Sequence, residues 1–183
     1  FTIDFWARFN NLSSRQVLFS SCNLDIADQS TNLGLELERP ALGNDNNEFI
    51  LKVQEGGTYD THTFAIPDSY VSTIVLNRFF HIALVRSPSG VIQLYINGVP
   101  SSNNSVTNTE TFNHGFNNSI YIGKSQSETE NYFSGYIDEF RIVNNAAFWS
   151  ANFSINGPCF GVPLTAHTGC TPGATGSLPC GRN

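Results

Sequence analysis

The sequence predicts an all-β protein built as a two-sheet antiparallel β-sandwich, or jelly roll. Three observations support this fold class. Apolar and polar residues alternate along many short segments, which is the pattern of strands with one buried face. Clusters rich in Gly, Pro, Asn and Ser separate these segments, and no long stretch shows the 3.6-residue apolar spacing of a helix. At 183 residues, the chain is long enough for one domain with a full core.

The first predicted strand, Thr2–Phe9, shows the alternation clearly. Ile3, Phe5 and Phe9 fall on one face, whereas Trp6 falls on the other. The same pattern predicts further strands at Gln16–Ser21, Leu33–Glu38, Glu48–Gln54, Phe79–Arg86, Val91–Asn97, Ser119–Gly123 and Phe133–Val143.

The stretch from Phe79 to Pro100 is the clearest hairpin. Its two apolar strands are joined by Ser87-Pro88-Ser89-Gly90, in which Pro presets a negative φ and Gly supplies a positive one. Asn97-Gly98 suits a type I′ turn that leads into a further short strand.

The composition changes near the end of the chain. The 27 residues from 157 to 183 contain six Gly, four Pro and three of the four Cys. Such a segment cannot build its own core, so we expect a sandwich over residues 1–157 and an irregular tail or linker over 158–183.

The charge balance excludes some partners. The net charge is −6, and the nine basic residues are scattered along the chain. Binding to a phosphate backbone or to an anionic membrane surface requires clustered Lys and Arg, so no nucleic acid partner is expected. No apolar run is long enough for a membrane span, so no membrane insertion is expected.

Four segments carry a family resemblance. They are Phe1-Thr-Ile-Asp-Phe-Trp6, the run from Phe80-His-Ile-Ala-Leu-Val-Arg86 to Leu94-Tyr-Ile-Asn-Gly98, Tyr121-Ile-Gly123 with Gly135-Tyr-Ile-Asp-Glu-Phe-Arg-Ile142, and Ala147-Phe-Trp-Ser-Ala-Asn-Phe153. In this order the sequence resembles a laminin G-like jelly roll of the concanavalin A-like lectin and glucanase superfamily. The resemblance covers about residues 1–156 and implies two antiparallel sheets packed face to face.

Members of this family usually have a strand before the Phe-Thr-Ile segment, and this sequence lacks it. In such a fold that strand would lie beside strands near the end of the chain, so we expect an unpaired edge or a gap in the core. Either the sequence is incomplete at its start, or the tail or another chain supplies the strand.

The superfamily includes glycan hydrolases, but no catalytic pattern is evident here. The Glu-x-Asp-x-x-Glu signature of the glucanases is missing, as is a Gly-x-Ser-x-Gly nucleophile elbow. Asp138 and Glu139 are adjacent and are expected to point to opposite faces. Glu36 and Glu38 alternate and are expected to form a solvated strand face, and His81 is expected to be structural. We therefore predict no catalytic residues and no enzyme activity.

Calcium is the cofactor that the resemblance favours, because hard oxygen ligands at the rim are common in the family. The candidate ligands are Asp28, Asn32, Gln126 and Glu128. Only Gln126 matches the calcium cluster of the pentraxin branch, so solvated loop residues are the alternative. A zinc site is not expected, because no Cys-x-x-Cys pair is present.

The remaining candidate sites concern ligands and covalent modification. Aromatic rings and amides suit sugar recognition, and the candidates are Phe116, Asn131, Tyr132 and Phe133. N-glycosylation motifs occur at Asn11, Asn103, Asn117 and Asn152, about as often as chance predicts. The cysteines Cys22, Cys159, Cys170 and Cys180 allow three pairings, of which Cys170–Cys180 with Cys22–Cys159 is favoured.

Disulfides fit an extracellular or a cell- or virion-surface location. The first function hypothesis is a non-catalytic recognition or adhesion module that binds glycan or protein through rim loops. The alternative is a structural subunit of an extracellular filament, sheath or virion appendage, with strand exchange between copies of the chain.

Overall fold

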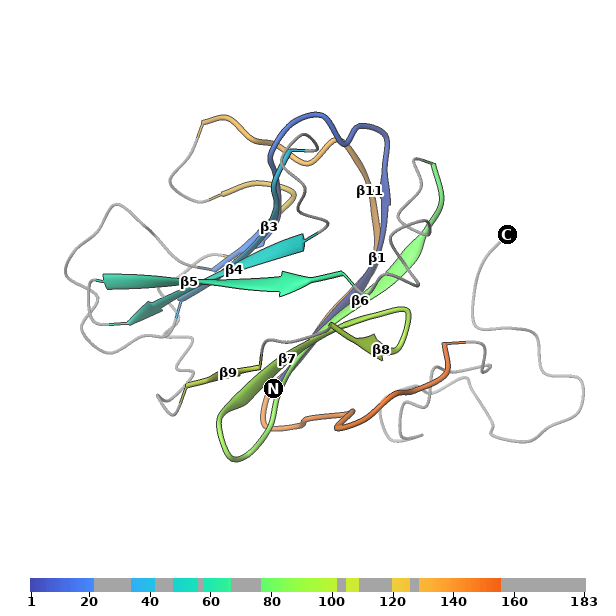
Figure 1. The fold of residues 1–183 in the computed structure, drawn as a ribbon. Helices are drawn as coiled ribbons and strands as arrows, with labels where there is room; N and C mark the ends of the chain where they lie inside the picture. Colours follow the sequence, from blue (N-terminus) through green and yellow to red (C-terminus); the bar gives the residue numbers. More distant parts are fainter. Residues whose placement is uncertain are drawn as a thin grey trace, which may run out of the picture.

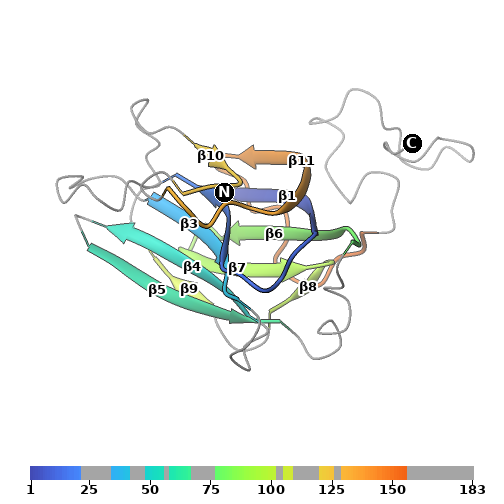
Figure 2. The same ribbon diagram turned by 90° about the horizontal axis from the view of Figure 1, so that it is seen from above.

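Two antiparallel sheets face one another in the computed structural model of the chain (Figures 1 and 2). The structure describes residues 1–21, 34–41, 48–55, 58–66, 77–101, 105–108, 120–125 and 129–155. All regular elements in these ranges are strands. The predicted two-sheet sandwich is therefore confirmed. None of the described segments forms a helix long and apolar enough to cross a membrane.

One sheet has six strands in the order β11-β1-β6-β7-β8, with β9 also paired to β7. The bounds of these strands are Thr2–Phe9 for β1, Phe80–Arg86 for β6, Val91–Ile96 for β7, Val99–Pro100 for β8, Val106–Thr107 for β9 and Gly135–Val143 for β11. The predicted hairpin is the β6–β7 pair, in which Leu84 lies opposite Leu94. Asn97 (φ 50°) and Gly98 (φ 82°) both have the left-handed conformation that a type I′ turn requires.

The other sheet has five strands in the order β10-β2-β3-β4-β5. Their bounds are Gln16–Ser20 for β2, Gly34–Arg39 for β3, Glu48–Glu55 for β4, Thr58–Ala65 for β5 and Tyr121–Ile122 for β10. The alternation pattern did not predict β5, because this strand lies at the edge of the sheet and buries few side chains. Asp60 and Thr61 are exposed, and Phe64 is the large apolar side chain that β5 adds to the core.

The core fills the space between the sheets with the residues that alternate inward. From β1 these are Ile3, Phe5, Ala7 and Phe9. The Phe5 ring stacks on Phe140 of β11 at a centroid distance of 5.4 Å. Full burial of an Ile or Phe side chain contributes roughly 1.5–3 kcal/mol, so this inward row of β1 is a large part of the stability of the sandwich.

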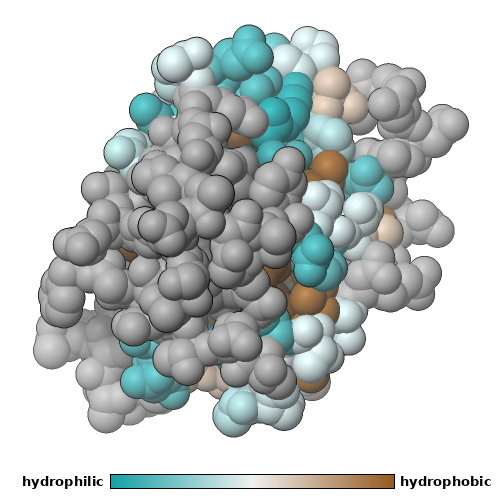
Figure 3. All heavy atoms as spheres, turned by 90° about the vertical axis from the view of Figure 1, so that its left-hand side faces the viewer, coloured by the Kyte–Doolittle hydropathy of each residue, from teal (hydrophilic) through white to brown (hydrophobic). Residues whose placement is uncertain are grey.

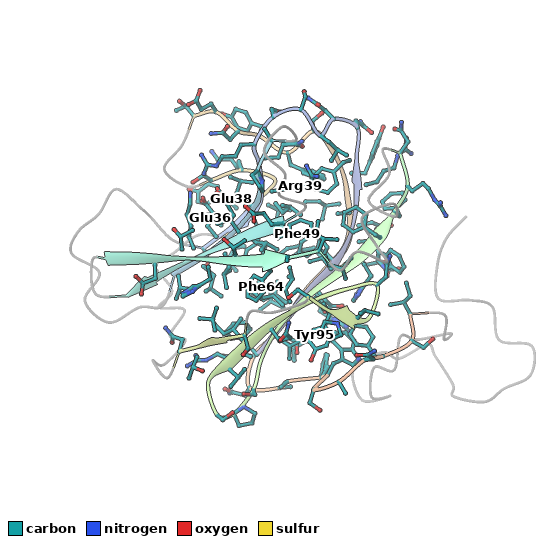
Figure 4. All side chains as sticks on the ribbon, viewed as in Figure 1. Glu36, Glu38, Arg39, Phe49, Phe64 and Tyr95 are labelled. Atoms are coloured by element: carbon teal, nitrogen blue, oxygen red, sulfur yellow. The ribbon has the colours of Figure 1, made fainter. Side chains whose placement is uncertain are left out.

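One charged side chain interrupts this apolar interior. The inward row of β3 is Leu35, Leu37 and then Arg39, which is 2% exposed and lies between the sheets above Phe49 (Figure 4). Its guanidinium lies 5.7 Å from the centroid of the Phe9 ring. One Nη donates a hydrogen bond to the Pro40 carbonyl at 3.3 Å, and Nε has no hydrogen-bond partner. Burial lowers the pKa of Arg39 because desolvation disfavours the charged guanidinium.

Because Arg39 has no carboxylate partner among the described residues, its charge is a net cost to folding. We expect Arg39→Met, which keeps most of the volume, to leave the free energy of unfolding unchanged or to raise it. Arg39→Ala leaves a cavity and is expected to lower that free energy by about 2 kcal/mol. Urea unfolding of both variants checks this, and a loss of stability in Arg39→Met similar to that in Arg39→Ala would contradict it.

The segment that follows β11 covers part of the outer face of the six-stranded sheet. It runs along β7 and β8 (Figure 1), and Trp149 packs with Val85 and Tyr95 of the sheet. Trp149 stacks on Phe153 at a centroid distance of 4.0 Å, and the Phe153 N–H donates a 2.9 Å hydrogen bond to the Gly98 carbonyl. The described chain ends at residue 155, so the boundary near 158 stays a prediction.

A β-bulge shapes the middle of β11. Asp4 of β1 lies opposite Arg141 and Trp6 lies opposite Asp138, so β11 has one residue more than β1 between these pairs. Glu139 has a φ of 52°, and both Asp138 and Glu139 are exposed. The expectation that these two acids point to opposite faces was based on regular alternation, and the bulge interrupts that alternation here.

Candidate binding site

The segment just before β11 presents an exposed tyrosine on a fixed backbone. The Asn131 carbonyl accepts a 2.9 Å hydrogen bond from the Val17 N–H of β2, and the Phe133 N–H donates a 2.8 Å bond to the Gly123 carbonyl. The next residue, Ser134, donates its N–H to the Gln16 side chain at 2.7 Å. These bonds tie the segment to β2 and β10.

Three large apolar side chains of this segment, of β10 and of the residue before β10 are exposed. Tyr132 is 55% exposed, Ile122 is 49% exposed and Ile120 is 41% exposed. Phe133 instead packs against the core, where its ring meets Phe9 edge to face at 4.9 Å. Phe133 therefore anchors the segment, and the alternation places Tyr132 outward. We call Asn131, Tyr132 and Ile122 the tyrosine strip.

Beside the strip, two buried carboxylates lie on the outer face of β3. The expectation of a solvated face at Glu36 and Glu38 is wrong: they are 0% and 4% exposed. β3 is the central strand of its sheet, and its neighbours supply cations on the same face. Figure 4 shows both glutamates on the opposite side of β3 from Arg39 and Phe49.

The two glutamates share the same two cations. Lys52 Nζ lies 3.3 Å from Glu36 Oε1 and 3.1 Å from Glu38 Oε2. Arg15 Nη2 lies 3.6 Å from Glu36 and contacts Glu38, and Arg15 Nε donates to Glu38 at 2.7 Å. Ser125, just after β10, donates its hydroxyl to Glu36 at 2.6 Å. We call these five residues the carboxylate cluster.

The electrostatics of the cluster are those of a charge-neutral network. Burial would lower the pKa of Lys52, but attraction by Glu38 and Glu36 outweighs it, so this pKa lies above its usual value. Glycoside hydrolysis requires one carboxylic acid that is free to protonate a leaving group. Both glutamates instead hold ion pairs, so the cluster supports the shape of the sheet next to the tyrosine strip.

Sequence reasoning missed the cluster for an identifiable reason. Alternation predicts that Glu36 and Glu38 share one face of their strand, but it does not identify their partner Lys52 on the neighbouring strand. Their contact depends on the β3–β4 register that pairs Glu36 with Lys52. Their burial depends further on Ser125, which arrives from a distant part of the chain.

A second polar group lies on the outer face of the six-stranded sheet. His81 is 1% exposed, and its Nε2 lies 3.2 Å from Asp4 Oδ2. Arg141 binds both oxygens of Asp4 through Nε at 2.8 Å and Nη2 at 2.7 Å. The rings of Trp149 and Phe153 pack edge-on against His81. Burial and the contact with Asp4 are what a structural histidine requires, so the structural role of His81 stays a prediction with supporting geometry.

The other predicted site residues stand as follows. Asn11 accepts hydrogen bonds from the Ser13 N–H and hydroxyl, both at 2.7 Å, and Asn152 is exposed. The calcium candidates Asp28, Asn32, Gln126 and Glu128, the ring of Phe116, Asn103, Asn117 and all four cysteines lie outside the described residues. Within the described ranges, no group of three or more His, Cys, Asp or Glu could hold a metal ion.

Two antiparallel sheets packed face to face define a β-sandwich of the jelly-roll type. The chain belongs to the concanavalin A-like lectin/glucanases superfamily, whose laminin G-type sequence profile matches residues 1–150. No curated protein sequence matches the chain.

Several solved structures are similar to the chain at low sequence identity. The heptameric SAP-like pentraxin of Limulus polyphemus is 16% identical, with a TM-score of 0.50 over 76% of this chain and 61% of the pentraxin. Domains LG4-5 of the mouse laminin alpha1 chain are 18% identical, with a TM-score of 0.48 over 76% of this chain and 34% of that one. The CBM40 of Ruminococcus gnavus IT-sialidase, bound to alpha2,3 sialyllactose, is 14% identical, with a TM-score of 0.49 over 76% and 72%. The chain thus spans less than two thirds of the pentraxin and laminin chains.

Proposed function

We propose that the protein is a non-catalytic recognition or adhesion module that binds glycan through the tyrosine strip. The observation that carries this proposal is Tyr132, whose ring is 55% exposed on a backbone fixed to two strands. An exposed aromatic ring offers a flat apolar face and a polar hydroxyl to a ligand. Because its backbone is fixed, the ring loses little freedom when a ligand binds.

The strip has the chemistry that sugars require. A pyranose presents an apolar C–H face, which stacks on an aromatic ring, and paired hydroxyls, which bind amides. Tyr132 supplies the ring, Ile122 extends the apolar surface, and Asn131 supplies the amide. Hydrophilic side chains gather at the top of the molecule in Figure 3, where the connection from β1 to β2 also lies. Of the candidates, Asn131 and Tyr132 are assigned to ligand contact and Phe133 to anchoring.

Several further features belong to the same proposal. An extracellular or surface location suits a glycan-binding module, and glycosylation at the exposed Asn152 and disulfides in the tail are consistent with it. A calcium ion on the predicted rim ligands would add oxygen-mediated sugar contacts. A protein ligand that presents an apolar side chain to Tyr132 is the second kind of partner for the same strip.

The alternative function, a structural subunit of a filament, is based on the outer edge of β11. No described strand pairs with the outer side of β11, and its core-facing residues Ile137, Phe140 and Ile142 remain partly exposed. However, the bulge places exposed Asp138 and Glu139 in the middle of that edge. Bulges and charges of this kind block the addition of a further strand, so recognition is the function that we propose.

A glycan array probed with the full chain, with and without EDTA, tests the proposal. We expect Tyr132→Ala to weaken binding of captured glycans about tenfold, the cost of losing one aromatic contact. Tyr136→Ala is the matched control, because Tyr136 is also 55% exposed but lies on β11. Blank arrays in both conditions would contradict glycan binding, and unchanged binding by Tyr132→Ala would contradict this site.

A further inference from the structure

The amide of Gln16 is buried at the start of β2. Gln16 is 0% exposed and lies opposite Arg39 in the β2–β3 register. A buried amide is costly to the fold unless its oxygen and its nitrogen both have hydrogen-bond partners. Gln16 Oε1 accepts a 2.7 Å bond from the Ser134 N–H, and Nε2 donates a 2.5 Å bond to the Asn11 carbonyl. The amide therefore bonds to the backbone of two segments that are distant from each other in the sequence.

These two segments lie side by side at one end of the sandwich. One is the connection from β1 to β2, and the other is the segment just before β11; both cross the top of the molecule in Figure 1. The Asn10 N–H donates a 2.9 Å bond to the Ser134 carbonyl, so the segments are also joined directly. The Phe133 ring packs against Phe9 in the core. Gln16 therefore bridges two neighbouring segments from its buried position on β2.

Tyr132 lies between two contacts with successive residues of β2. On one side the Val17 N–H bonds to the Asn131 carbonyl, and on the other the Ser134 N–H bonds to the Gln16 side chain. The bond from Val17 uses backbone atoms, which any residue other than proline supplies. The bond to Gln16 uses a side chain, so it depends on the identity of residue 16. The direction of the exposed Tyr132 ring therefore depends on this buried amide.

We propose that Gln16 is a positioning residue of the tyrosine strip, which fixes the Tyr132 ring relative to the connection from β1 to β2. This inference rests on the proposed glycan site, because the direction of the ring matters where the ring meets a ligand. A ring that is already held in place loses little freedom on binding, whereas a mobile ring must be ordered at a cost in affinity. Gln16 acts through Tyr132 and does not contact the glycan, because it is fully buried.

Stability alone does not distinguish positioning from a purely structural role of Gln16. Loss of a buried hydrogen bond destabilises a fold wherever the bond lies. Positioning predicts, in addition, a local change at Tyr132 and a loss of glycan affinity. Gln93 of β7 is the matched control in the other sheet, because its Nε2 donates to the Ser101 hydroxyl at 2.9 Å and to the Leu94 carbonyl at 3.1 Å.

Fluorine NMR of the full chain labelled with 3-fluorotyrosine tests the positioning without a ligand. Tyr132→Phe assigns the Tyr132 resonance through its loss, and Tyr95, which is buried on β7, is the reference. We expect Gln16→Met, which keeps the volume and removes both hydrogen bonds, to shift or broaden the Tyr132 resonance and to leave the Tyr95 resonance unchanged. Gln93→Met is expected to leave the Tyr132 resonance unchanged.

A second variant keeps this experiment decisive if Gln16→Met does not fold, as judged by near-UV circular dichroism. Gln16→Asn keeps the amide but is shorter by one methylene, so it does not reach both Ser134 and Asn11. It is expected to change the Tyr132 resonance in the same way. An unchanged Tyr132 resonance in a folded Gln16 variant would overturn the proposal.

Glycan affinity provides the second test. For a glycan that Tyr132→Ala weakens, we expect Gln16→Met to reduce the affinity about fivefold, the cost of ordering one mobile ring. In the Tyr132→Ala background, Gln16→Met is expected to change the affinity by less than about twofold, because its effect passes through the ring. Equal losses in both backgrounds would contradict action through Tyr132. Blank glycan arrays would contradict the proposed function, whereas the Tyr132 resonance decides the role of Gln16 whatever the arrays show.

Discussion

Gly98→Ala is expected to lower the free energy of unfolding by about 3 kcal/mol, through backbone strain and steric overlap together. Gly98 has a φ of 82°, a conformation that disfavours any side chain. A Cβ at this position would also lie 1.9 Å from the Phe153 carbonyl oxygen and 2.9 Å from its carbon. Because both neighbouring atoms belong to backbone, no side-chain rotation relieves the overlap.

The overlap is expected to displace the segment that covers the sheet. That displacement breaks the hydrogen bond from the Phe153 N–H to the Gly98 carbonyl and the stacking of Trp149 on Phe153. Urea unfolding followed by tryptophan fluorescence measures both the stability and the environment of Trp149. Gly123→Ala is the matched control, since Gly123 has a φ of 77° but a Cβ there would lie 3.6 Å from Phe133 Cβ. Equal losses in the two variants would contradict a role for the overlap.

Gly98 also shows how far local sequence patterns can predict this fold. The Asn97-Gly98 pair predicts the turn because positive φ is a property of these two residues. The need for a glycine, rather than another asparagine, comes from Phe153, whose backbone lies against the turn although it is distant in the sequence. Most strands were predictable because the alternation of apolar and polar residues is likewise a local property of the sequence. The edge strand β5 was not, because a strand that buries one large side chain shows little alternation.

The candidate site likewise contains residues that were predictable from the sequence and residues that were not. Asn131 and Tyr132 were predictable as an amide and a ring in a connecting segment, and the exposure of Tyr132 agrees with that expectation. The burial of Glu36 and Glu38 was not predictable, because it requires the β3–β4 register, Arg15 and Ser125 together. Alternation assigns a residue to a face of its strand, but it does not say whether another part of the chain covers that face.

Substitution of Asp4 is expected to have the second large effect on stability, because the covered outer face of the six-stranded sheet isolates the Asp4 charge from water. The side chain is 7% exposed, and it binds Arg141 through two hydrogen bonds and His81 through one. Burial alone would raise the pKa of Asp4, but the hydrogen bonds from His81 and Arg141 outweigh it, so this pKa lies below its ordinary value of 3.8. Asp4→Asn keeps the shape and removes the charge, which leaves Arg141 without its ion pair.

Asp4→Asn is expected to lower the free energy of unfolding by about 3 kcal/mol at pH 7, the usual cost of removing one partner of a buried pair. Since the pKa of Asp4 is lower in the folded protein than in the unfolded chain, its contribution is complete above the unfolded value. It is lost as the pH falls from about 4 toward the folded value. The gap in stability between the wild type and Asp4→Asn should therefore narrow at acid pH. Urea unfolding from pH 7 to pH 3 measures this gap in stability. Asp60→Asn is the control, because Asp60 is exposed. It is expected to change the free energy of unfolding by less than about 0.5 kcal/mol. A gap that stays constant over this range would show that the charge of Asp4 does not stabilise the fold.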